Sequence, residues 1–111
     1  MIPATIYPCN TYVFRCHSLD TAKEDLKAIY EEYYKYILTE YFDNPGYTIR
    51  LPNGSVIVLL NEEYINNIPI IVHEAFHVTE FIMDYVHTPL TDDTSEPYAY
   101  LLGYIVEQIL K

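Results

Sequence analysis

Two histidines and one glutamate stand close together in the middle of the chain, in the segment His73-Glu74-Ala75-Phe76-His77. If this segment is helical, His73 and His77 are one turn apart and lie on the same face. Two imidazoles at that spacing can reach one tetrahedral zinc ion. Glu74 lies about 100° round the helix from His73, where it can act as a base without binding the metal. The segment therefore predicts a zinc site with its own general base.

A catalytic zinc site usually has three protein ligands and one open position for water. We expect Glu96 to be the third ligand, because residues 78–95 leave room for a helix end, a turn and a returning helix. The small Ala99, one turn later, would let that helix approach closely. The other interpretation of Glu96 is a first-turn carboxylate that interacts with the helix dipole.

The elements that must position these residues follow from hydrophobic spacing and turn signals. We predict strands over about 5–16, 47–50 and 55–60, and the last two form a hairpin with Asn53-Gly54 at its turn. Helices are predicted over about 21–41, after a capping box, and over about 68–86. A further helix, capped by Ser95 or Thr94, continues to about Leu110. The expected fold is α+β, a small and mostly antiparallel sheet with three helices, in one domain over 1–111.

The segment from about residue 70 to 104 resembles the gluzincins, the thermolysin-like clan of zinc metallopeptidases. These enzymes carry His-Glu-x-x-His on one helix and a ligand Glu on the next helix. In this chain Glu96-x-x-Ala99 is similar to the motif that contains that ligand Glu. The resemblance implies a minimal zincin-like domain with the pentad on its second helix. It implies that His73, His77 and Glu96 hold Zn²⁺ and that Glu74 is the general base. It also implies that strand 55–60 is the sheet edge along which an extended peptide lies.

The chain departs from that pattern at the position after Ala99, where many gluzincins have an acidic residue that orients a histidine ligand. Tyr100 occupies this position, so Asp93 or Asp92 would have to supply the carboxylate. The oxyanion-stabilising group is left open among four residues, namely Tyr98, Tyr100, Tyr104 and His87. As a rival metal ligand, His87 would lie roughly 20 Å from His73 in a continuous helix, so we interpret it as a helix C-terminal residue.

Composition limits the partners of the chain. Its 111 residues carry a formal net charge of −10, which argues against nucleic acid and against an anionic membrane surface. We expect no transmembrane span and no signal peptide. We interpret Cys9 and Cys16 as free thiols of a reducing compartment, which gives a cytoplasmic expectation. The oligomeric state is left open.

The predicted activity is hydrolysis of a peptide bond, with zinc polarising the carbonyl and Glu74 moving the proton. The alternative is a zincin-like binding or structural module without turnover. Small stand-alone zincins of this kind resemble proteins encoded by phages and other mobile elements, so a virion-associated role fits either function. A third hypothesis has no metal and makes the Tyr-rich helix over 21–41 the contact face of an acidic adaptor.

Overall fold

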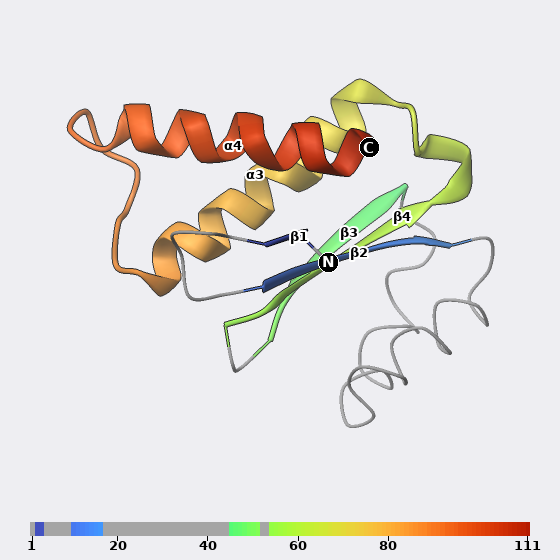
Figure 1. Ribbon diagram of the computed structural model, residues 1–111, viewed down its shortest axis with the longest axis horizontal. Helices are drawn as coiled ribbons and strands as arrows, with labels where there is room; N and C mark the ends of the chain where they lie inside the picture. The colour runs from blue at the N-terminus through green and yellow to red at the C-terminus, as the bar shows by residue number, and fades with distance from the viewer. Residues whose placement is uncertain (1, 4–9, 17–44, 52–53) are drawn as a thin grey trace.

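The computed structural model describes residues 2–3, 10–16, 45–51 and 54–111 (Figure 1). The strands are β1 (Ile2–Pro3), β2 (Asn10–Cys16), β3 (Gly46–Arg50) and β4 (Val56–Asn61). A short 3-10 helix, η1 (Glu62–Tyr64), leads into the helix α3 (Ile68–Tyr85), and α4 (Ser95–Leu110) follows. Cys9, the start of the predicted strand over 5–16 and the predicted helix over 21–41 lie outside the described residues.

The sheet has the strand order β1-β2-β4-β3, so β4 lies between β2 and β3. β4 pairs antiparallel with β3 through the predicted hairpin, and parallel with β2 over six residue pairs from Thr11–Val56 to Cys16–Asn61. β4 is buried from Val56 to Leu60, and strands flank it on both sides. A continuous apolar run is typical of such a central strand.

Both helices pack on the same side of the sheet (Figure 1). Alternate residues of β4 and one face of each helix build the core there, since side chains alternate along a strand and recur every three or four residues on a helix. The members of this core are Val56, Val58, Leu60, Ile71, Ala75, Val78, Ile82, Met83, Tyr98, Leu101, Ile105 and Ile109.

The ends of α3 follow its local sequence. The side chain of Asn67 accepts a hydrogen bond from the amide of Ile70 at 3.2 Å, and Pro69 occupies the first turn, where its missing amide costs no hydrogen bond. The helix ends at Tyr85, and His87 adopts a positive φ of 58° just beyond it. The predicted start of this helix is therefore confirmed and its end lies one residue earlier.

The prediction of three helices is wrong, and the sheet is mixed, with two antiparallel strand pairings and one parallel pairing. The described residues contain two α-helices, with the pentad on the first of them, and the longest strand pairing is parallel. The chain crosses over between β2 and β3, which lets β4 enter the sheet between them. Strand 55–60 is therefore central, and β1 and β3 lie at the two edges of the described sheet. The coarser assignment to an α+β fold holds.

Within the described part of the chain, neither helix combines the length and apolar character that a membrane span needs.

Candidate active site

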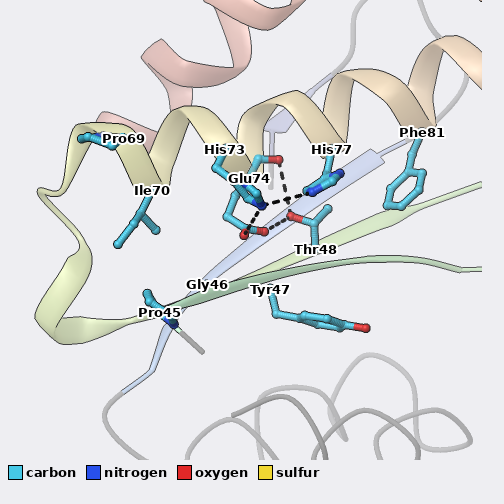
Figure 2. Close-up of a pocket in the computed structure, with 10 residues that line it drawn as sticks. All are labelled: Pro45, Gly46, Tyr47, Thr48, Pro69, Ile70, His73, Glu74, His77 and Phe81. Atoms are coloured by element: carbon cyan, nitrogen blue, oxygen red, sulfur yellow. Dashed lines mark hydrogen bonds and ion pairs between the residues drawn. The ribbon is translucent and has the colours of Figure 1, made fainter. Parts of the chain in front are cut away.

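An open cleft of about 640 Å³ lies between α3 and the edge strand β3 (Figure 2). Its walls combine the residues expected to do chemistry with apolar and small side chains. They are Pro45, Gly46, Tyr47 and Thr48 from the β3 side, and Pro69, Ile70, His73, Glu74, His77 and Phe81 from the α3 side. His73, Glu74 and His77 of the pentad thus face the cleft, whereas Ala75 belongs to the core.

His73 and His77 turn their rings toward one another at the cleft. Their Nε2 atoms lie 3.3 Å apart and their ring planes are inclined by 78°. Two nitrogens bound to one tetrahedral zinc, each about 2.0–2.1 Å from it, lie about 3.3–3.4 Å apart. In the absence of metal, the same distance allows a hydrogen bond between a protonated and an unprotonated Nε2. The pair fits two positions of a zinc site.

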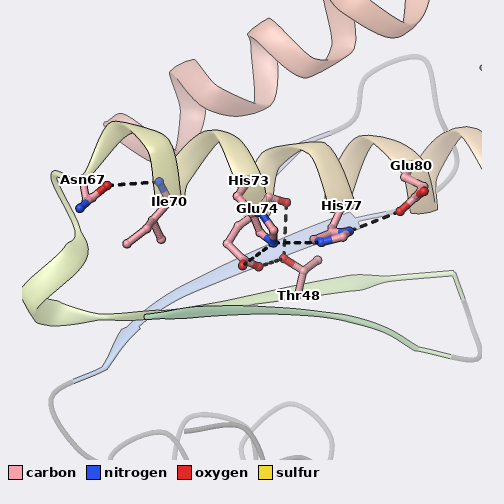
Figure 3. Close-up of polar contacts among 7 residues, drawn as sticks. All are labelled: Thr48, Asn67, Ile70, His73, Glu74, His77 and Glu80. Carbon is pink, nitrogen blue, oxygen red and sulfur yellow. Dashed lines mark hydrogen bonds and ion pairs between the residues drawn. The ribbon is translucent and has the colours of Figure 1, made fainter. Parts of the chain in front are cut away.

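Glu80 contacts the other nitrogen of His77. Its Oε1 lies 3.3 Å from Nδ1 of His77, one turn along the exposed face of α3 (Figure 3). A proton on Nδ1 can be donated to this carboxylate, which leaves the Nε2 lone pair facing His73. The carboxylate that orients the histidine therefore comes from the pentad's own helix. Asp92 and Asp93 are exposed in the turn before α4.

Glu74 is buried, with 5 % of its surface exposed, and its carboxylate lies between α3 and β3. Oε1 of Glu74 lies 4.0 Å from Nε2 of His73, and Oε2 accepts a hydrogen bond from the hydroxyl of Thr48 at 2.5 Å. A carboxylate at that distance from Nε2 of His73 can reach a water held at the histidine pair. This position suits a base better than a ligand.

Glu96 is exposed at the start of α4. It precedes the buried Tyr98 by two residues, so it lies about 200° round the helix from it, on the side away from the core. Among the described residues, no group of three or more His, Cys, Asp or Glu side chains could hold a metal ion. The structure therefore does not bring Glu96 together with His73 and His77. Ala99, expected to let the two helices approach each other, is also exposed. Tyr98 and Leu101 are the residues of this part of α4 that pack into the core with α3.

The residues predicted to stabilise an oxyanion lie away from the cleft walls. Tyr98 packs its ring against Phe76 with 6.1 Å between centroids, and burial followed by the charge of Glu80 raises its pKa above 10.0. Tyr104 packs against the core, whereas Tyr100 is 76 % exposed. His87 is exposed beyond the end of α3. None of these four described side chains lines the cleft.

The four cleft residues from the β3 side, Pro45, Gly46, Tyr47 and Thr48, were missed from the sequence. Gly46 and Thr48 pair with Leu60 and Val58 of β4, so both point to the helix side of the sheet. A side chain at Gly46 would bring its Cβ to 2.9 Å from Cγ of Glu74, which explains the glycine. Tyr47 points to the opposite face (Figure 2). The available signal was the alternation of side-chain direction along 46–50. It identifies cleft residues only once β3 is known to lie beside α3 at an edge of the sheet.

No protein-family model, curated protein or solved structure matches the chain.

Proposed function

We propose that this chain is a zinc-dependent peptidase in which His73 and His77 bind the metal and Glu74 is the general base. The observation that carries the proposal is the 3.3 Å separation of the two Nε2 atoms at the wall of a cleft, with the Glu74 carboxylate beside them. A bound zinc would polarise the scissile carbonyl and lower the pKa of a water molecule. A purely structural site would gain nothing from a buried carboxylate at this position.

The chain's own residues supply the proton transfer and the substrate position. Oε1 of Glu74 takes a proton from the attacking water and passes it to the leaving amine. Glu80 keeps the proton of His77 on Nδ1. The outer side of β3 offers backbone amides and carbonyls to an extended peptide, which would lie along the cleft. The net charge of −10 favours neutral or basic peptides.

Glu96 is the proposed third ligand, on the resemblance to the gluzincins. The first turn of α4 lies beside the pentad helix, because Tyr98 contacts Phe76 next to His77. The exposed position of Glu96 requires its side chain to swing round the helix end to reach the metal. Metal content of a Glu96→Ala protein separates a ligand from a first-turn carboxylate.

The test is elemental analysis of protein purified without a His tag, for the native chain and for His77→Ala, Glu96→Ala and Glu74→Gln. We expect about one zinc per chain in the native protein and in Glu74→Gln, and loss of zinc in His77→Ala, since zinc sites need their nitrogen ligands. Retention of zinc in Glu96→Ala would remove Glu96 from the ligand set and leave the histidine pair in place.

Turnover is then measured on a mixed peptide library by mass spectrometry. Glu74→Gln should lower kcat by at least about 100-fold with zinc retained, because general acid–base catalysis typically contributes 10²–10⁴-fold. Native chains that bind no zinc even when it is supplied, or a Glu74→Gln protein with normal turnover, would overturn the peptidase proposal.

The second candidate function is a binding or structural module without turnover. It is favoured by the lack, among the described residues, of a third ligand beside the histidines. Zinc-loaded native protein that cleaves no peptide, yet binds one equally well as Glu74→Gln, would support it. For either function we propose a cytoplasmic setting, or a virion setting if a phage encodes the chain.

A further inference from the structure

The two carboxylate oxygens of Glu74 have different neighbours (Figure 3). Oε2 accepts the hydroxyl proton of Thr48 at 2.5 Å, whereas Oε1 faces Nε2 of His73 at 4.0 Å. The Thr48 hydroxyl also lies 3.4 Å from the main-chain carbonyl of Glu74, a longer contact in which the same proton has a second, weaker acceptor. One oxygen is thus held by the sheet, and the other is directed at the histidine pair.

The space round Glu74 leaves its side chain little freedom. The residue is 5 % exposed, and β3 passes so close that only a glycine fits at position 46 without touching Cγ and Cδ of Glu74. A buried carboxylate is stable only when hydrogen bonds satisfy it. Thr48 supplies such a bond from the strand that lies across the cleft from α3.

We infer that Thr48 is a positioning residue for the proposed general base, with Gly46 providing the space that lets the Thr48 hydroxyl reach Glu74. The inference rests on the proposed function. Thr48 holds Oε2, so that Oε1 alone receives the proton of the attacking water. Because β3 is also an edge strand of the described sheet, the same strand would fix the base and the extended substrate relative to each other.

The experiment compares Thr48→Val, which removes the hydroxyl at nearly constant volume, with Thr48→Ser, which keeps it. Thr48→Val should lower kcat about ten- to a hundredfold and leave KM within about twofold, since misplacing a catalytic group by about 1 Å can cost 10²-fold. Thr48→Ser should recover most of the activity. Zinc content should be unchanged in both, because Thr48 does not contact the histidines.

Thr11→Val is the matched control. Thr11 is a fully buried threonine of the same sheet, and its hydroxyl makes no hydrogen bond to the described residues. The same substitution there should leave kcat and the melting temperature of the protein unchanged or slightly higher. A Thr48→Val protein whose kcat stays within about twofold of native, or a Thr48→Ser protein as impaired as Thr48→Val, would overturn the inference.

Thermal unfolding of the metal-free protein tests the contact independently of activity. Thr48→Val should lower the melting temperature by about 5–10 °C in the native background, because it removes a hydrogen bond to a charged group. In a Glu74→Ala background the same substitution should cost less than half of that. Equal costs in both backgrounds would mean that Thr48 does not hold Glu74. If the native chain has no turnover, the proposed function fails. The comparison of melting temperatures in the two backgrounds still decides whether Thr48 holds Glu74.

Discussion

At the scale of single residues, Glu80 links the histidine pair of the cleft to helix α4. Its carboxylate lies 3.3 Å from Nδ1 of His77, and its negative charge adds to burial in raising the pKa of Tyr98 on α4. Tyr98 in turn packs against Phe76, which neighbours His77 in sequence. One carboxylate therefore acts on a histidine of the candidate site and on a tyrosine of the helix packed behind it.

The raised pKa of Tyr98 makes the stability of the protein depend on alkaline pH. The folded protein holds the phenolic proton more tightly than the unfolded chain, whose tyrosine titrates near 10.0. The contribution of the protonated Tyr98 to the stability of the fold is fully present below pH 10. It is lost as the pH rises from 10 through the raised pKa of Tyr98 in the folded protein. The free energy of unfolding measured in urea should therefore fall more steeply above pH 10 for the native protein than for Tyr98→Phe.

Tyr100→Phe is the control for this comparison, since Tyr100 is 76 % exposed on the same helix. It should follow the native protein at every pH. Parallel stability curves for the native protein and Tyr98→Phe above pH 10 would contradict the assignment.

At the scale of elements, α3 divides its surface between the core and the cleft. Ile71, Ala75 and Val78 are fully buried against the sheet and α4, while His73 and His77 lie on the more exposed side. Glu74 occupies the boundary, where β3 passes closest. The packing of this one helix therefore sets how the histidines, the base and the strand face each other.

The start of α3 depends on its cap. Asn67→Ala removes the side-chain hydrogen bond to the amide of Ile70 and should cost about 1 kcal/mol of the free energy of unfolding. The melting temperature should fall by roughly 4–8 °C. Asn66→Ala, at the exposed neighbouring position, is the control and should change it little. Equal losses in the two variants would argue against a capping role.

At the scale of the whole molecule, the strand order decides which part of the sheet meets the cleft. β4 is paired on both sides, which leaves β3 as the open edge beside α3 in the described sheet. The acidic balance of 16 Asp and Glu against 6 Lys and Arg lowers the attraction of the whole surface for phosphate backbones. The proposed substrate, a neutral or basic extended peptide, is consistent with a cleft at an edge strand of an acidic protein.

Zinc should stabilise the folded molecule, because the histidine pair is assembled only when α3 is formed. At a free zinc concentration about 100 times Kd, the gain is about 2.7 kcal/mol, or roughly 11–22 °C in melting temperature. His73→Ala should abolish the shift. His87→Ala should keep it, since His87 lies beyond the end of α3 and outside the cleft walls. A shift of the same size in His73→Ala would place the metal elsewhere.

The sequence by itself determined the local features of this protein. The spacing of His73 and His77 on one helical face, the start of that helix at Ile68 and the hairpin between β3 and β4 all depend on neighbouring residues, so local patterns were sufficient. The continuous apolar run over 56–60 also carried the signal of a central strand, although it was assigned to an edge.

Only the tertiary structure decided which distant residues meet at the cleft. The parallel pairing of β2 with β4 depends on a crossover, and no periodicity within either strand specifies its partner. The meeting of Thr48 and Gly46 with Glu74 follows from that strand order. The outward direction of Glu96 follows from which face of α4 packs best, where Tyr98, Leu101 and Ile105 are buried. Helical and strand periods are properties of local backbone geometry, whereas these contacts depend on the packing of the whole core.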